Sequence, residues 1–130
     1  MRKISILGST GSVGRSTLAV VDAFPEQLRV VGLSAGSNID LLVEQAERYR
    51  PELVSVRNAD DAAALRKRVA GVEILHGDEG ASAVASLGSA DAVIAAIVGA
   101  AGIPPVYAAL RAGKRVGIAN KEVLVAPATS

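Results

Sequence analysis

Residues 4–14 read Ile4-Ser5-Ile6-Leu7-Gly8-Ser9-Thr10-Gly11-Ser12-Val13-Gly14, an apolar run that leads straight into a glycine-rich turn. The pattern G-x-x-G-x-x-G is a variant of the fingerprint with which a strand–turn–helix unit binds dinucleotides. In such a unit Gly8 permits a tight turn, Gly11 lets the backbone approach a pyrophosphate, and Gly14 lets the helix pack closely. Free amide groups of the first helical turn then face the anion, and Thr10 and Ser12 add hydroxyl donors. The alternative is a plain glycine-rich loop, but the flanking strand and helix favour nucleotide binding.

Beyond this turn, short apolar runs alternate with amphipathic stretches along the whole chain. The runs are typical of buried parallel strands, and the stretches have helical spacing with prolines or glycines near their ends. We predict strands at 4–7, 28–33, 53–56, 72–75, 91–95 and 115–119, and helices at 13–24, 39–49, 58–69, 79–87 and 104–112. This series predicts an α/β fold, a Rossmann-like open parallel sheet with helices on both faces.

Composition limits the other classes of protein. The chain has 130 residues, 14 basic against 13 acidic side chains, and no cysteine. This length suits one domain, and the lack of cysteine excludes a disulfide scaffold and a thiolate metal site. A net charge of +1 argues against a nucleic-acid partner, and the longest apolar runs, such as 92–101, are too short to span a membrane. We therefore expect a cytoplasmic protein with no nucleic-acid or membrane partner.

The end of the second predicted strand suggests which dinucleotide is bound. Enzymes that use NAD usually place Asp or Glu there to hold the ribose 2′-hydroxyl, whereas this chain has Leu33-Ser34-Ala35-Gly36-Ser37-Asn38 and no acid before Asp40. A carboxylate would repel a 2′-phosphate, and small hydroxyl and amide donors would bind it. Ser37 and Asn38 are thus a candidate 2′-phosphate site, with Arg15 as an assisting cation, and the pattern favours NADP over NAD. The alternative is that Asn38 merely caps its helix.

Polar residues elsewhere give weaker signals. Asn120-Lys121-Glu122 follows the last predicted strand and is either a substrate and cofactor site or the start of a helix with Asn120 as its cap. His76, the only histidine, does not make a metal site with one neighbouring aspartate, so we predict no metal ligands here. Glu44 and Arg48 are spaced for a surface pair on one helix.

Three motifs together resemble one enzyme family. The turn from Leu7 to Gly14, then Ala35-Gly36-Ser37-Asn38, then Ile118-Ala119-Asn120-Lys121-Glu122 look like those of 1-deoxy-D-xylulose 5-phosphate reductoisomerase, in its order and spacing. The resemblance implies an NADPH-dependent enzyme of non-mevalonate isoprenoid biosynthesis, which converts 1-deoxy-D-xylulose 5-phosphate to 2-C-methyl-D-erythritol 4-phosphate. It also implies these site residues: Gly8, Thr10, Gly11, Ser12 and Val13 at the pyrophosphate, Gly36, Ser37 and Asn38 at the adenosine phosphate end, Asn120 and Glu122 on NADPH, and Lys121 on the substrate.

The resemblance also suggests what lies outside this chain. Members of that family continue well beyond residue 130, with their acidic ligands for Mg or Mn, substrate-phosphate site and catalytic residues there, and they form homodimers when full-length. We interpret residues 1–125 as an NADPH-binding Rossmann domain, and residues 126–130 as a tail that departs from the family pattern. We predict that the chain alone binds NADPH without turnover. Many members carry Lys or Arg where this chain has Ser37.

Two rival hypotheses remain. One is another NAD(P)-dependent reductase with the same glycine turn, such as a semialdehyde dehydrogenase or a dihydrodipicolinate reductase. The other is a non-enzymatic nucleotide-sensing Rossmann domain. The Asn120-Lys121-Glu122 segment favours the reductoisomerase over the other reductases, and the nucleotide preference would separate a reductase from a sensor.

Overall fold

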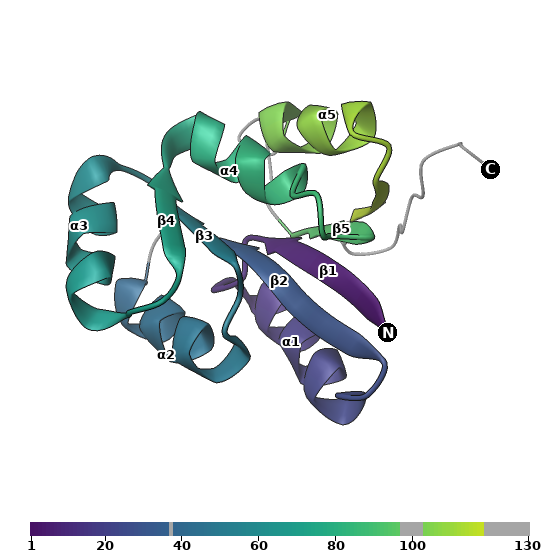
Figure 1. Cartoon of the computed structure of the whole chain (residues 1–130), viewed down its shortest axis with the longest axis horizontal. Coiled ribbons are helices and arrows are strands. Elements are labelled where there is room, and N and C mark those ends of the chain that lie inside the picture. Colours follow the sequence, from purple (N-terminus) through teal and green to yellow (C-terminus); the bar gives the residue numbers. More distant parts are fainter. Residues whose placement is uncertain (37, 97–102, 119–130) are drawn as a thin grey trace.

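The computed structural model of the chain describes residues 1–36, 38–96 and 103–118, which form a single sheet flanked by helices (Figure 1). The strands are β1 (Arg2–Leu7), β2 (Leu28–Ser34), β3 (Leu53–Val56), β4 (Glu73–His76), β5 (Ala92–Ala95) and β6 (Arg115–Ile118). The helices are α1 (Ser12–Ala23), α2 (Ile39–Tyr49), α3 (Ala59–Arg68), α4 (Gly77–Ala85) and α5 (Ile103–Arg111). The predicted Rossmann-like parallel fold is confirmed.

The strands pair in parallel in the order β4-β3-β2-β1-β5-β6. The chain steps outward from β1 to β4, and α4 then leads it back across the sheet to β5 on the other side of β1. Leu7 pairs with Ser34 of β2 and with Ala95 of β5, so these three strands end at the same level. The strand order therefore reverses beside β1, the point at which open α/β sheets bind their ligands.

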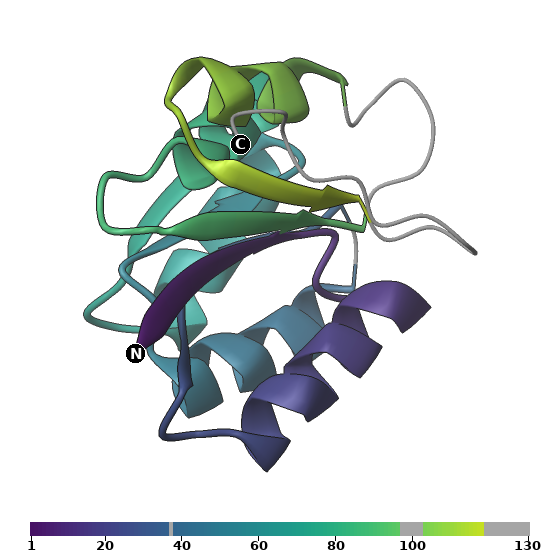
Figure 2. The same cartoon turned by 90° about the vertical axis from the view of Figure 1, so that its right-hand side faces the viewer.

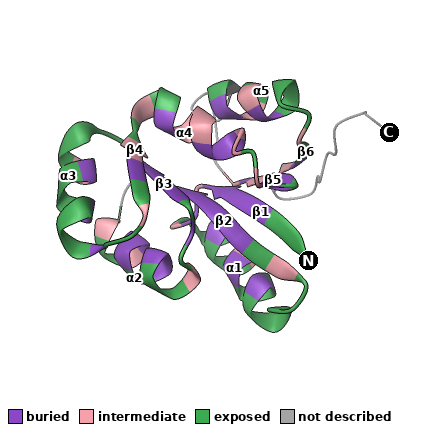
Figure 3. Ribbon diagram, in the orientation of Figure 1, coloured by how far each residue is buried: buried purple, intermediate pink, exposed green. Residues whose placement is uncertain are grey.

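Helices cover both faces of the sheet. Figure 2 shows α1 and α2 on one side of the strands and α5 on the other. Side chains alternate between the faces, so Ile4 and Ile6 of β1 join the core under α1, α2 and α3, while Leu7 joins the core under α4 and α5. The central strands are buried almost throughout, as Figure 3 shows, and this explains why they read as continuous apolar runs.

Small residues let α4 lie directly on the sheet. A Cβ on Gly32 of β2 would lie 2.6 Å from the hydroxyl of Ser5 and 3.0 Å from Val84 of α4, so any side chain there would push the helix away. On the same face, a Cβ on Gly80 of α4 would overlap the hydroxyl of Ser55. This close contact keeps the start of α4 near the carboxyl ends of β2 and β3.

Most element bounds differ by one or two residues from the predictions, and two differences have a clear physical reason. α4 begins at Gly77 instead of residue 79, because Gly77 takes a positive φ of 74° and turns the chain directly from β4 into the helix. Arg48 pairs with Asp22 of α1 at 3.1 Å and not with Glu44, because the packing of α2 on α1 brings that carboxylate within reach. In the part of the chain that the structure describes, no helix has the length and apolar character needed to cross a bilayer.

Candidate functional site

A cavity of about 460 Å³ lies at the carboxyl ends of the strands, where the strand order reverses. Five separate segments form its wall. They are Gly8, Thr10 and Gly11 after β1, Ser34, Ala35, Gly36 and Asn38 at and after the end of β2, Ser55, Val56 and Arg57 at and after the end of β3, Gly77, Asp78 and Ala81 of α4, and Ala96 after β5. The cavity therefore joins the glycine turn to the end of the second strand, the two segments that the sequence predicts for a dinucleotide.

The glycine turn is held in place by main-chain hydrogen bonds. Gly8 has a φ of +85°, and its amide donates to the carbonyl oxygen of Ser34 at 2.7 Å. The amide of Ser9 donates to the same oxygen at 3.0 Å. On the other side of the turn, the buried side chain of Gln45 in α2 donates from Nε2 to the carbonyl oxygen of Ser9 at 2.9 Å. The turn is thus fixed to β2 and to α2 at once.

Gly14 brings α1 onto this turn. A Cβ on Gly14 would overlap the carbonyl oxygen of Gly8 and lie 2.7 Å from the Cα of Ser9. Side chains of any size at this position would therefore force the helix and the turn apart. This confirms the packing role that the sequence assigns to the third glycine. At Gly11, by contrast, a Cβ would make only an ordinary contact of 3.6 Å.

The start of α1 has the features of an anion-binding site. Its cap residue is Gly11, in an extended conformation and with no side-chain hydrogen bond, and the first turn contains no acidic residue. Ser12 and Val13 are exposed. The amide groups at the start of a helix lack partners within the helix, and the helix dipole makes that end positive. These amides are therefore available to phosphate oxygens at the edge of the cavity.

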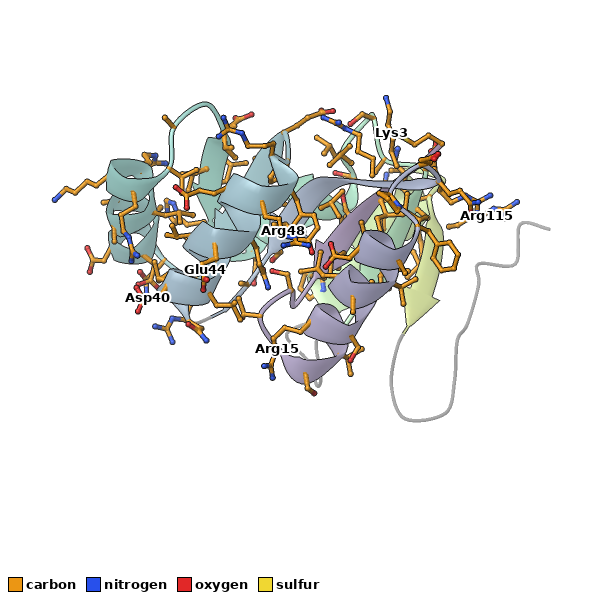
Figure 4. The ribbon with its side chains drawn as sticks, turned by 90° about the horizontal axis from the view of Figure 1, so that it is seen from below. Lys3, Arg15, Asp40, Glu44, Arg48 and Arg115 are labelled. Atoms are coloured by element: carbon orange, nitrogen blue, oxygen red, sulfur yellow. The ribbon has the colours of Figure 1, made fainter. Side chains whose placement is uncertain are left out.

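The loop after β2 carries no negative charge into the cavity. Asn38 has a left-handed backbone (φ 60°, ψ 64°), and its Oδ1 accepts from the amide of Leu41 at 3.2 Å, so it does cap α2. The nearest acid, Asp40, pairs with Arg68 of α3 at 2.6 Å. Figure 4 labels Asp40 on α2. A Cβ on Gly36 would meet nothing within 4 Å, so the space above this residue is open.

The structure adds Arg57, which sequence reasoning missed. This residue follows β3 directly and lines the cavity. Its guanidinium lies 3.5 Å from the carboxylate of Asp61, one turn into α3. Arg15, which the sequence suggests as the assisting cation, does not line the cavity; its Nε donates to the carbonyl oxygen of Gly11 at 3.4 Å (Figure 4). The signal that could have found Arg57 is its place at the carboxyl end of a buried parallel strand.

A buried hydroxyl on the cavity wall lacks a partner within the chain. Ser55 is 1% exposed, and its Oγ makes no hydrogen bond. This hydroxyl lies at the close contact of β3 with α4, where a Cβ on Gly80 would overlap it.

A second polar cluster, away from the cavity, holds α1 and α2 together. The hydroxyl of Tyr49 donates to Asp22 at 2.8 Å, and Arg48 pairs with the other oxygen of that carboxylate. Burial raises the pKa of Tyr49, and the hydrogen bond to the Asp22 carboxylate adds to this effect. The pKa of Arg48 is raised by its own hydrogen bond to Asp22 and by the negative charge of that carboxylate. This cluster fixes α2, and with it Asn38, relative to the helix that begins at the glycine turn.

The predicted site residues fall into three groups. Gly8, Thr10, Gly11, Gly36 and Asn38 line the same cavity. Ser12 and Val13 lie at the start of α1, next to the cavity but outside its wall. The predicted residues Ser37, Asn120, Lys121 and Glu122 lie outside the described residues, as does most of the small-residue segment 96–102.

Comparison with known proteins is consistent with this site. The chain matches the family model described as 1-deoxy-D-xylulose 5-phosphate reductoisomerase over residues 4–128. The 1-deoxy-D-xylulose 5-phosphate reductoisomerase of Geobacter sp. (strain M21) is 54% identical over 127 residues, which make up 96% of this chain and 33% of that protein. The chain thus spans about a third of the length of this relative.

Solved structures agree with the sequence comparison. A crystal structure of DOX-P reductoisomerase in complex with NADPH, fosmidomycin and magnesium has a TM-score of 0.88 and 40% identity, covering 92% of this chain and 30% of that chain. The enzyme from Zymomonas mobilis in complex with NADPH has a TM-score of 0.84 and 34% identity, covering 92% of this chain and 32% of that chain.

Proposed function

The chain belongs to the 1-deoxy-D-xylulose 5-phosphate reductoisomerase family, and we propose that it is the NADPH-binding part of such an enzyme. The observation that carries this proposal is the cavity at the reversal of strand order, which the uncapped start of α1 borders. Residues 1–125 would form the nucleotide-binding domain, with 126–130 as a short segment after it. Two solved relatives, at 40% and 34% identity, are complexes with NADPH, which supports the choice of cofactor.

Different residues of the chain would bind different parts of the cofactor. The amides of Ser12 and Val13 would hold the pyrophosphate at the positive end of α1, and Gly11, whose own amide donates to the carbonyl oxygen of Gly8 at 3.3 Å, would let the phosphate approach the backbone. Gly36, Ser37 and Asn38 would surround the phosphate on the adenosine ribose, in a loop without a carboxylate. From the family motif, Asn120 and Glu122 would contact NADPH, and Lys121 the substrate.

The whole enzyme would convert 1-deoxy-D-xylulose 5-phosphate to 2-C-methyl-D-erythritol 4-phosphate, a step of isoprenoid biosynthesis. NADPH supplies the hydride for the reduction, and the protein supplies position and electrostatics. The residues described here bind and orient the nucleotide, while the buried strands under the cavity exclude water from its floor.

A divalent cation would require ligands from elsewhere in such an enzyme. The described residues contain no group of three or more His, Cys, Asp or Glu that could hold a metal ion, and Asp78 is the one carboxylate among the described residues of the cavity wall. These residues do not fit a Mg or Mn site, which takes several oxygen ligands. We therefore propose that this chain alone binds NADPH without turnover.

The assembly and compartment belong to the same proposal. A full-length enzyme of this kind would act in the cytoplasm on a small sugar phosphate. It would be a homodimer, since closed two-fold dimers are the commonest oligomers. Size-exclusion chromatography with light scattering on this chain and on a full-length relative would test the dimer, which we expect only for the longer protein.

Calorimetric titration of the chain with NADPH, NADH and ADP tests the nucleotide proposal. We expect NADPH to bind tightest. Equal or tighter binding of ADP would favour a nucleotide sensor, and no binding of any of the three would refute the site.

An assay with 1-deoxy-D-xylulose 5-phosphate, NADPH and Mg or Mn should give no oxidation of NADPH by the isolated chain.

Variants at the helix cap make the test specific to the phosphate site. Gly11→Asp puts a carboxylate at the start of α1, where aspartate is a good cap, so the chain should remain as stable as before. The new charge should repel the pyrophosphate and weaken NADPH binding by roughly tenfold or more. Gly11→Asn is the matched control, because it caps the same amides without the charge and should bind more tightly than Gly11→Asp. Equal affinities for the two variants would contradict an anion at this position.

A further inference from the structure

The described cavity wall contains a single basic side chain, Arg57, and a single acidic one, Asp78. They come from different elements. Arg57 follows β3, and Asp78 lies in the first turn of α4. Arg57 is therefore the cation that the described cavity wall offers to an anionic ligand.

The strand register places Arg57 beside the loop after β2. Ser34 pairs with Ser55, and the amide of Ala35 continues the ladder by donating to the carbonyl oxygen of Ser55 at 3.0 Å. Adjacent strands lie about 4.8 Å apart, so the two residues that follow, Gly36 and Arg57, leave the sheet side by side. Gly36 has open space above it, and Gly36 and Arg57 both line the cavity.

The guanidinium of Arg57 remains free to bind a ligand. Its ion pair with Asp61 is long, at 3.5 Å, and its side chain is 64% exposed. Such surface pairs are weak, and a guanidinium carries five N–H donors, so one contact leaves most of them available. Asp61 holds the side chain loosely and competes with an anion for it.

We propose that Arg57 is the cation that recognises the 2′-phosphate of NADPH and so sets the preference for NADPH over NADH. The planar fork of a guanidinium matches two phosphate oxygens, and a 2′-hydroxyl offers no such charge. The loop after β2 supplies no Lys or Arg of its own between Ser34 and Asn38, so the charge comes from the neighbouring strand. This inference rests on the proposed NADPH site and adds to it the residue that recognises the 2′-phosphate.

The test uses two probes that differ only by the phosphate in question, 2′,5′-ADP and 5′-AMP, together with NADPH and NADH. Each is titrated by calorimetry into the wild-type chain and into Arg57→Met. We expect Arg57→Met to lose roughly 10- to 100-fold in affinity for 2′,5′-ADP and NADPH, with little change for 5′-AMP and NADH. Arg57→Lys keeps the charge without the planar guanidinium, so its affinities for 2′,5′-ADP and NADPH should lie between those of the wild type and those of Arg57→Met.

Two further variants control for charge and for the competing carboxylate. Arg29→Met removes the same charge from an exposed residue near the other end of β2 and should leave all four affinities unchanged. Asp61→Asn removes the competitor of the phosphate and should tighten 2′,5′-ADP several-fold without affecting 5′-AMP.

The possible results separate this inference from the proposed function. If Arg57→Met weakens all four ligands equally, Arg57 does not read the 2′-phosphate, although the nucleotide site stands. If Arg57→Met binds all four ligands as the wild type does, the inference is also wrong. If the wild-type chain binds none of the four, the proposed function fails and the inference with it. Arg57 is exposed, so its variants should fold, and their urea unfolding curves verify this.

Discussion

Replacing Gly14 by alanine should destabilise the chain, although the same change usually stabilises a helix. Alanine is favoured over glycine by about 1 kcal/mol inside a helix. At this position, however, the new Cβ would lie 2.7 Å from the Cα of Ser9 and would overlap the carbonyl oxygen of Gly8. Carbon atoms that are not bonded lie about 3.5 to 4.0 Å apart, so α1 and the turn would have to separate by roughly 1 Å.

That separation fixes the expected magnitude. Overpacking of this kind costs about 1 to 3 kcal/mol, and more where backbone atoms must move, which exceeds the gain in helix propensity. We expect Gly14→Ala to lower the free energy of unfolding by about 2 kcal/mol. With a urea slope of about 1 to 3 kcal/mol per M, the unfolding midpoint falls by roughly 1 M. NADPH binding should weaken as well, because the turn that borders the cavity moves.

Urea unfolding followed by circular dichroism measures this effect, with Gly88→Ala as the control. A Cβ on Gly88 would meet nothing within 4 Å, and this residue has no positive φ. Gly88→Ala should therefore be as stable as the wild type or slightly more stable. If Gly14→Ala is as stable as Gly88→Ala and binds NADPH normally, the contact of α1 with the turn does not have the role described here.

Three further predictions concern single side chains. The pKa of Tyr49 in the folded chain is raised above the usual value of 10.0. The contribution of Tyr49 to the free energy of unfolding is therefore fully present below pH 10 and is lost as the pH rises through the folded pKa. Stability should therefore fall at high pH less steeply in Tyr49→Phe, as thermal unfolding across that range would show; equal slopes would contradict this. Asn38→Ala should lower the free energy of unfolding by about 2 kcal/mol, because it removes the hydrogen bond that caps α2 at Leu41 and strains a left-handed backbone. Asn38→Gly should lower it by less, because glycine adopts that backbone without strain. Urea unfolding that ranks the two variants the other way would exclude this explanation. Ser55→Ala should leave the free energy of unfolding unchanged or raise it by less than about 1 kcal/mol, because its hydroxyl has no partner, and a clear loss would reveal one.

Most of the architecture follows from sequence because the strands are buried on both faces. β3 needs no tertiary information to be recognised, since Leu53-Val54-Ser55-Val56 is an apolar run between a proline and a helix cap. The start of α4 was harder to predict. Gly77 begins α4 because its positive φ removes any connecting loop, a conformation that residue type permits but does not require.

The candidate site was predicted in part, for a reason that lies in the sheet order. Gly8, Thr10, Gly11, Gly36 and Asn38 were recognisable because a known motif or the end of a strand marks each of them. Arg57 was missed because its proximity to Gly36 depends on β3 pairing with β2, which spacing along the chain does not specify. The pair of Arg48 with Asp22 was missed for a similar reason, since it depends on how two helices pack.

Because the glycine turn is anchored to β2 and α2, the two ends of the cavity differ in how freely their residues can be substituted. The end proposed for the pyrophosphate is formed by backbone atoms of the glycine turn, which β2 and the side chain of Gln45 hold in place, so substitution of most other neighbouring side chains should not alter it. The ribose end presents side chains such as Asn38 and Arg57 on loops that bear little of the core. If the proposed site is right, a few substitutions at the ribose end would therefore change the preference between NADPH and NADH without altering the binding of the pyrophosphate that both nucleotides share.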